Sequence, residues 1–518
     1  MINLHQAYLR SEGQSNFIFF VSTATLVFAV LGIVFLSPMT VFAILVGTLV
    51  VIMTIVRPLW SLALLAFLLP FEPFLLKWTP DEIFLYARLF SEVLIYFLFA
   101  VTVVRAVMRG EKLMSTPIGF PFFLFLITLV ASSVINFVDP FVVAVGVRQL
   151  IRFILVFFIV VLLKPSRGYI RKLTVALFVL VSLQATLGIG QAIIGEPLDA
   201  LLLPSEVRSY GEFTLQQGAV QFWDSGSRVF GTLGRYDRLG TFIAFFLLIG
   251  VGFLYEKGIR LHRRELWFLF ALGLPALVLT FSRSSWFGFL LGFLFLALFV
   301  KRDKRVLWGS LIATAVLGMY LAYSGIVVSR LIDVPDQPLA ERFFEAFSYE
   351  RWRGEYYGLG RLFWIVQTVT TVLPASPLLG WGPGQYGGGV ALLFHNTRVY
   401  DELQLPYGVY GTEGYIDNNW FSILGETGLI GFSFFLWMYI GLFLYAIKVG
   451  RRSDDPFVRA ISFGFAGAMI AVALNSFLAT FFEVRSLAVY LWMYGGFVVV
   501  LGIETDRKKL IDATDVLV

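Results

Sequence analysis

Long apolar segments recur along the whole chain, and they constrain its fold more than any other feature. A helix that crosses a bilayer needs roughly 20 mostly apolar residues. Of the 518 residues 58% are hydrophobic and only 14% are charged, whereas soluble domains carry about 25% charged residues. The pattern therefore predicts an all-α polytopic membrane protein with about fourteen transmembrane helices.

The positions of these helices follow from the apolar runs. The sequence up to residue 15 is polar and mixed in charge, and no small-residue cleavage site follows the apolar run after it, so we expect no cleavable signal peptide. The predicted spans are 16–36, 39–56, 59–76, 87–107, 118–137, 141–163, 171–194, 237–255, 265–281, 285–300, 306–326, 427–447, 458–481 and 486–503.

Lysine and arginine in the short loops predict the orientation. With these spans, the basic loops all fall on one side, which the positive-inside rule assigns to the cytoplasm, together with both termini. The domain prediction is then residues 1–326 for helices one to eleven, with an extracytoplasmic loop at about 195–236. A large extracytoplasmic loop with amphipathic helices follows at 327–418, and residues 419–518 form the last three helices and a cytoplasmic tail.

Composition also excludes several kinds of site. Cysteine is absent, which removes disulfides and thiolate nucleophiles, and there are only three histidines. We therefore expect no metal and no cofactor. The net charge of +6 is modest for a membrane protein, and we do not expect nucleic-acid binding.

Arginines collect where the predicted helices meet the outer surface, and two of them lie inside a span. Guanidinium groups match phosphate oxygens, so such a cluster predicts a site for a lipid-linked phosphate or diphosphate. The alternative is snorkelling or structural ion pairs, for instance between Arg235 and Asp237. The candidate arginines are Arg148, Arg152, Arg235, Arg238, Arg283 and Arg361.

Two carboxylates lie where the large loop re-enters the membrane. Asp417 and Glu426 are the candidate catalytic residues, because a carboxylate beside a sugar hydroxyl can act as general base. Asp417 also fits a helix N-cap. His395 is a weaker candidate base and fits ordinary polar surface. The glycine-rich turn at 380–387 lacks the residues of a phosphate loop and predicts a backbone bend.

Three motifs in this order resemble the O-antigen ligase/polymerase superfamily, over about residues 228–435. One is a serine–arginine turn before an aromatic residue, one is an arginine–tryptophan segment followed by a proline- and glycine-rich run, and one is the re-entry motif. They read Ser282-Arg283-Ser284-Ser285-Trp286, then Gly360-Arg361-Leu362-Phe363-Trp364 with Pro377-Leu378-Leu379-Gly380-Trp381-Gly382-Pro383-Gly384, then Asp417-Asn418 through Glu426-Thr427-Gly428-Leu429-Ile430-Gly431.

The resemblance implies a C-type glycosyltransferase-like membrane fold and a metal-independent inverting glycosyltransferase. Such an enzyme transfers a glycan from an undecaprenyl-diphosphate carrier to a hydroxyl of an acceptor glycan or lipid-linked glycan, on the outer face of the bacterial cytoplasmic membrane. Arg283 and Arg361 match the family's diphosphate-binding arginines. Asp417 stands where ligases usually have histidine, which fits a polymerase-like or exopolysaccharide member better than a ligase. Polysaccharide assembly proteins are expected as partners.

Two other classes of function remain open from the sequence. A flippase for lipid-linked oligosaccharides would also need about a dozen helices and buried arginines. A non-enzymatic scaffold for envelope assembly is the third class. Convergence of Arg283, Arg361 and Asp417 in one outward-facing cavity would favour the transferase, whereas a transporter would line a path that reaches both sides.

Overall fold

The computed structural model describes residues 23, 37–111, 116–204, 207–210, 213–216, 227–258, 263–332, 334, 337–408, 416 and 418–515. The first predicted helix, 16–36, lies outside the described residues apart from position 23.

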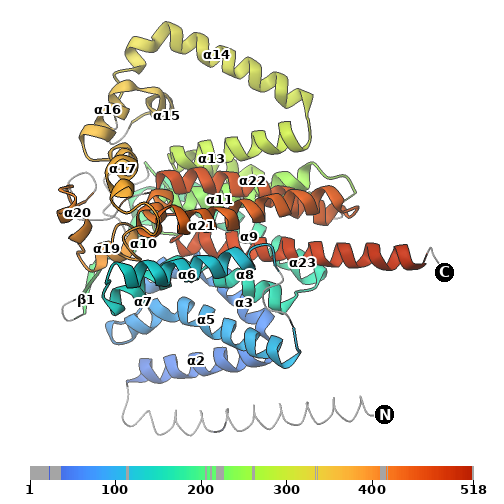
Figure 1. Ribbon diagram of the computed structural model, residues 1–518. Helices are drawn as coiled ribbons and strands as arrows, with labels where there is room; N and C mark the ends of the chain where they lie inside the picture. Colours follow the sequence, from blue (N-terminus) through green and yellow to red (C-terminus); the bar gives the residue numbers. More distant parts are fainter. Residues whose placement is uncertain are drawn as a thin grey trace, which may run out of the picture.

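Nine helices in the described part of the chain are long and apolar enough to cross a membrane. This confirms a polytopic helical membrane protein. In Figure 1 these helices run roughly side by side. They are α2 (Pro38–Val56), α5 (Asp81–Met108), α9 (Arg167–Ile194), α11 (Tyr236–Leu254), α13 with its π-helical continuation η1 (Arg283–Leu294, Phe295–Val300), α14 (Lys304–Val328), α21 (Asn419–Arg452), α22 (Pro456–Leu478) and α23 (Arg485–Asp515).

The other predicted spans coincide with helices that are shorter or interrupted. One pair, α7 and α8, bends by 56° and counts as a tenth span if taken together. The predicted span 59–76 is also interrupted, because the chain turns after α3. Pro73 stands in the first turn of the next helix, a position that suits proline because the backbone amide there has no partner within the helix. The count of about fourteen is therefore not confirmed. These helices are α3 (Pro58–Leu68), α4 (Glu72–Lys77), α6 (Gly119–Ile135), α7 (Pro140–Ile151), α8 (Ile154–Leu163) and α12 (Arg263–Leu279).

Short elements gather at one end of the long helices, at the left of Figure 1, whereas α23 runs out at the opposite end. A two-stranded antiparallel hairpin among them departs from the all-α prediction; it pairs Val207 with Gln216. The short elements are α10 (Glu196–Leu202), β1 (Val207–Tyr210), β2 (Phe213–Gln216), α15 (Leu339–Phe344), η2 (Glu345–Phe347), α16 (Tyr349–Tyr357), α17 (Arg361–Gln367), η3 (Thr368–Val372), α18 (Leu373–Ala375), α19 (Gly388–Leu393) and α20 (Arg398–Glu402).

The core lies around α11, α22 and α23, whose apolar stretches are mostly buried inside the protein. Small residues allow these backbones to approach closely, as is usual between membrane helices. A Cβ added at Gly252 of α11 would lie only 2.2 Å from the carbonyl oxygen of Ala460 in α22. This contact joins the end of α11 to the start of α22, and the opposite ends of the two helices face the short elements.

Helix α14 has a different environment. Only 6% of its apolar stretch is buried inside the protein, and in Figure 1 it stands apart from the other long helices. Tyr320 of α14 stacks on Phe344 of α15, with ring centroids 4.4 Å apart. The remaining apolar surface of α14 is suited to contact with lipid.

Candidate functional site

An arginine-lined cavity of about 430 Å³ lies at the end of the bundle where the short elements gather. The start of α11, the turn between α12 and α13, the segment α15–α17 and the end of α22 all contribute to its wall. Its cationic lining residues are Arg235, Arg283, Arg342, Arg351 and Arg361. We call this space the arginine cavity.

One fully buried carboxylate holds three of these arginines in place. Glu345 has no solvent exposure, and its Oε1 lies 2.6 Å from Arg283 Nη1 and 2.8 Å from Arg351 Nη1. Arg342 Nη1 lies 3.6 Å from the other carboxylate oxygen. A buried charge of this kind is stable only when it is paired, so Glu345 fixes the guanidinium groups before any ligand binds.

A second carboxylate, that of Glu355, links Arg361 to the arginines around Glu345. Glu355 accepts a hydrogen bond from Arg351 Nη2 at 2.6 Å and another from the backbone amide of Arg361 at 3.0 Å. Asp237 pairs with Arg235 at 3.0 Å, which is the structural ion pair considered for Arg235 from the sequence. Among the described residues of this site, five arginines thus meet three carboxylates.

The turn that carries Arg283 is built from its own neighbours. Phe281 has a positive φ of 52°, which ends α12, and Ser282 is extended before α13 begins. Ser282 and Ser285 are joined by a hydroxyl–hydroxyl hydrogen bond of 2.8 Å, and the Trp286 indole donates to the Leu277 carbonyl at 2.7 Å. Arg283 is therefore the first residue of α13, at the wall of the cavity.

The glycine-rich turn interlocks with the start of α21. Helix α21 is interrupted at Gly428, whose φ is 62°. Four backbone hydrogen bonds join residues 377–382 to the helix on both sides of this interruption. In two of them the Trp381 amide donates to the Gly425 carbonyl at 3.0 Å, and the Leu429 amide donates to the Pro377 carbonyl at 2.8 Å. These close contacts explain why glycine recurs in both motifs, and they agree with the predicted backbone bend.

Glu426 lies inside this junction. Its side chain is buried and accepts a hydrogen bond from the amide of Gly387 at 3.2 Å, and its carbonyl oxygen accepts one from Gly382 at 2.9 Å. It is not among the residues that line the arginine cavity. The geometry gives Glu426 a role in holding the glycine-rich turn.

Residues 268–436 match the family model described as O-antigen ligase. This confirms the resemblance to the O-antigen ligase/polymerase superfamily. No curated protein shows significant sequence similarity to the chain. The match supports glycan transfer of the O-antigen ligase/polymerase kind as the general class of activity, in a multi-pass membrane protein.

The O-antigen ligase segment contains most of the arginine cavity. Four of its five arginines, both glutamates that hold them, the glycine-rich turn and Glu426 all lie within residues 268–436. Arg235 comes from outside the segment and completes the wall. Arg238 follows on α11 but is not a lining residue.

The start of α21 is capped by Asn418. Its side-chain oxygen accepts a hydrogen bond from the Phe421 amide at 3.2 Å, so the cap considered for Asp417 is provided by its neighbour. Asp417 itself lies outside the described residues. Asn418 also donates to the carbonyl of Phe477 at 2.7 Å, and Phe477 lines the arginine cavity.

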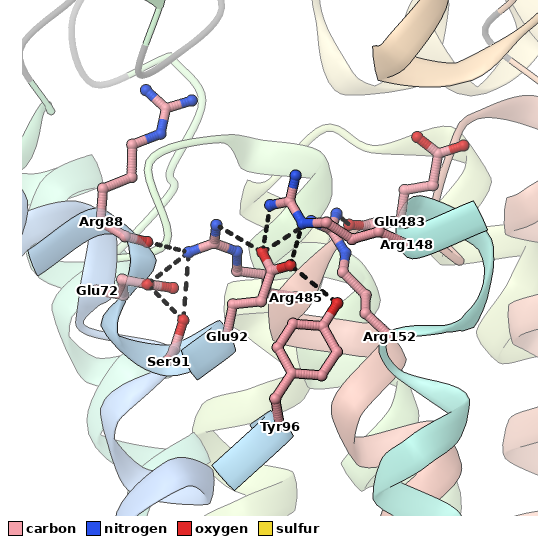
Figure 2. Close-up of polar contacts among 9 residues, drawn as sticks. All are labelled: Glu72, Arg88, Ser91, Glu92, Tyr96, Arg148, Arg152, Glu483 and Arg485. Atoms are coloured by element: carbon pink, nitrogen blue, oxygen red, sulfur yellow. Dashed lines mark hydrogen bonds and ion pairs between the residues drawn. The ribbon is translucent and has the colours of Figure 1, made fainter. Parts of the chain in front are cut away.

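Arg148 and Arg152 belong to a second charged group, shown in Figure 2, and neither lines the arginine cavity. Both contact the buried Glu92: Arg148 Nη2 lies 2.6 Å from one oxygen, with a second bond from its Nε, and Arg152 Nη1 lies at 3.3 Å. Arg485 bridges this group to Glu72 at 2.6 Å. We call the residues of Figure 2 the Glu92 network; they are Glu72, Arg88, Ser91, Glu92, Tyr96, Arg148, Arg152, Glu483 and Arg485.

Glu483 connects the Glu92 network to the starts of α19 and α21. It lies in the connection between α22 and α23, and its backbone carbonyl accepts from Arg152 at 3.2 Å. Its carboxylate accepts from the Gly389 amide at 3.2 Å and from the Asn419 side chain at 3.0 Å. Burial raises the pKa of the Glu483 carboxyl above its ordinary value, although these donors act in the opposite direction.

Sequence reasoning thus found three of the five cavity arginines and missed Arg342, Arg351 and the glutamates that position them. It also missed Glu92, Arg485 and Glu483. Glu92 carried a usable signal, because a lone carboxylate inside an apolar span needs a cationic partner.

Proposed function

We propose that this protein transfers a glycan from an undecaprenyl-diphosphate-linked oligosaccharide to a sugar hydroxyl, on the outer face of the bacterial cytoplasmic membrane. In a polymerase reaction the product would be a longer O-antigen or exopolysaccharide chain. In the related ligase reaction the glycan would be transferred to a different acceptor. The observation that carries the proposal is the arginine cavity, in which a buried carboxylate already holds the guanidinium groups in place.

The guanidinium groups of the arginine cavity suit the chemistry of a diphosphate. A diphosphate ester carries roughly two negative charges, and guanidinium groups bind its oxygens in pairs. Aromatic residues such as Trp352 and Phe347 share the wall with the arginines and offer surfaces for a sugar ring or a prenyl chain.

The chemistry follows from this placement. The acceptor hydroxyl attacks the anomeric carbon, a new carbon–oxygen bond forms with inversion, and the diphosphate leaves with the bonding electrons. Arg283, Arg351 and Arg361 would stabilise the charge that develops on the leaving group, because they are already oriented. A general base must take the hydroxyl proton, and Asp417 is our proposed base. No step in this scheme requires a metal or a nucleotide.

The Glu92 network is part of the proposal as a second cationic region. Arg148, Arg152 and Arg485 are held by carboxylates. The helix of Arg148, α7, packs against the glycine-rich turn, because a Cβ added at Gly146 would lie 2.7 Å from the backbone of Pro383. Arg148 and Arg152 remain proposed diphosphate ligands from the sequence, and Arg238 remains one beside Arg235.

We further propose that the shorter and interrupted helices also cross the membrane in a C-type glycosyltransferase-like arrangement. Together with the predicted helix at 16–36 they would give about fourteen crossings. Both termini would then be cytoplasmic, and residues 327–418 would form the large outer loop.

The test is a reconstituted transfer assay with an undecaprenyl-diphosphate-linked oligosaccharide, scored by chain extension. Arg351 and Arg353 lie on the same helix, but only Arg351 lines the arginine cavity, whereas Arg353 is exposed and pairs with Glu350. We expect Arg351→Ala to lower the rate about 100-fold, the order found for one transition-state donor. Arg353→Ala should leave it unchanged.

The same assay tests the proposed base. Asp417→Asn should abolish extension while donor binding is retained, because the amide cannot accept the proton. Full activity of both Arg351→Ala and Asp417→Asn would overturn the site. Movement of the donor across vesicles without any transfer would establish the flippase instead.

A further inference from the structure

A second cavity lies at the opposite end of the bundle from the arginine cavity. Its volume is about 660 Å³, and it is lined by the end of α2, the start of α3, the last turns of α5 and the first turns of α9. Helix α5 shows the separation directly: Glu92, in its first half, belongs to the Glu92 network, whereas Arg105, near its end, lines this second cavity. We call it the basal cavity.

The charges of the basal cavity all have one sign. Its lining includes Arg57, Arg105, Arg109 and Lys172, and no acidic residue among the described ones. Arg105 donates to the carbonyl of Ile55, and Arg109 lies 4.0 Å from Glu111, which is not a lining residue. The basal cavity therefore differs from the arginine cavity, whose cations are held by carboxylates.

The rest of the lining is apolar and interfacial. Phe67, Leu162 and Leu163 form part of the wall, and Trp60 at the mouth is 67% exposed. Tyr169 lies beside them and donates its hydroxyl to the Leu59 carbonyl at 2.5 Å. Tryptophan and tyrosine prefer the level of the lipid headgroups, so the cavity opens at a membrane surface.

This combination of an apolar wall and a cationic lining fits an amphiphile with an anionic head. We propose that the basal cavity binds an anionic phospholipid of the leaflet opposite the arginine cavity, with its phosphate near Arg57 and Lys172 and an acyl chain along Phe67. Basic pockets between helices on the cytoplasmic side are suited to such headgroups. The site is independent of the proposed glycan transfer.

The experiment uses the full chain in detergent and measures thermal stabilisation by phosphatidylglycerol, with phosphatidylcholine and inorganic phosphate in parallel. Each cation near the headgroup contributes about fivefold in affinity. The double variant Arg57→Gln with Lys172→Gln should therefore bind phosphatidylglycerol about 25-fold more weakly. Both residues are exposed, so the substitutions leave the packing intact.

The matched control removes the same charge elsewhere on the predicted cytoplasmic side. Lys304 and Arg451 are exposed and do not line the basal cavity, so Lys304→Gln with Arg451→Gln should bind as the wild type does. Equal loss in both double variants would show only general surface attraction and overturn the site. Equal stabilisation by phosphatidylcholine or inorganic phosphate would overturn the assignment to an anionic lipid.

Discussion

Glu345 shows how a single side chain can define a binding surface. Arginines repel one another, and long side chains lose rotamer freedom when they are held together. The buried carboxylate of Glu345 offsets the repulsion between Arg283 and Arg351 and their loss of rotamer freedom. It stays paired with both arginines because an unpaired buried charge would be strongly destabilising. The guanidinium groups at the cavity are thus already held in place by the protein itself.

Glu483 gives a prediction on pH. Because burial raises its pKa in the folded protein, the protonated form favours folding. Its contribution to stability is fully present below the ordinary value of 4.5 and is lost as the pH rises through the raised pKa. We expect the unfolding temperature of the wild type to fall over this range, and Glu483→Gln to lack this part of the decline. Identical pH profiles of the two proteins, measured by thermal unfolding in detergent, would contradict the assignment.

At the scale of elements, the junction between the glycine-rich turn and α21 carries the tightest packing near the site. A Cβ at Gly425 would lie 2.0 Å from the ring of Tyr386, which is buried and stacked on Tyr400. The rings of Tyr386 and Tyr400 have no room to move, so a methyl group added at Gly425 would overpack this junction.

We therefore expect Gly425→Ala to destabilise the protein by about 1–3 kcal/mol, seen as a lower unfolding temperature. Gly441 lies on the same helix and is the matched control, because the nearest atom to an added Cβ is 3.6 Å away. Gly441→Ala should be neutral or slightly stabilising, since alanine is the better helix former. Equal unfolding temperatures for the two variants would rule out this account of the junction.

The positions of the helices were largely predictable. Hydropathy is averaged over roughly twenty residues, so a few polar residues within a span do not hide it. Every predicted span beyond residue 37 coincides with a helix or an interrupted pair. The interruptions were not predictable. The bend between α7 and α8 falls at Arg152, whose partner Glu92 lies on another helix and is brought to it only by the fold. The cap of α21 was misplaced by one residue because Asp417 and Asn418 have nearly equal capping preference.

The site was less predictable than the helices. Arg283 and Arg361 stood out through their motifs, but Glu345 looks like any charge on an amphipathic segment. Only the fold brings it against Arg283, which lies far away in the chain. Arg342 and Arg351 could be recognised as cavity residues only in the structure, because both pair with Glu345.

At the scale of the whole molecule, the orientation is open to a direct test. The chain has no cysteine, so single cysteines can be introduced as unique labels. Tyr357 on α16 is 75% exposed, and the Asp454 side chain is 94% exposed at the opposite end. A membrane-impermeant maleimide should label Tyr357→Cys in intact cells and Asp454→Cys only after permeabilisation. The reverse pattern would place the arginine cavity on the cytoplasmic side.

The break at Gly428 also limits how the molecule can move. Four backbone hydrogen bonds fasten residues 377–382 to the interrupted helix at the membrane surface. Lifting that segment away would leave these groups unsatisfied in an apolar environment, at a cost of about 1–3 kcal/mol each. Under the proposed function, we expect exchange of substrate and product to proceed with this attachment intact, so that any opening motion involves other parts of residues 327–418.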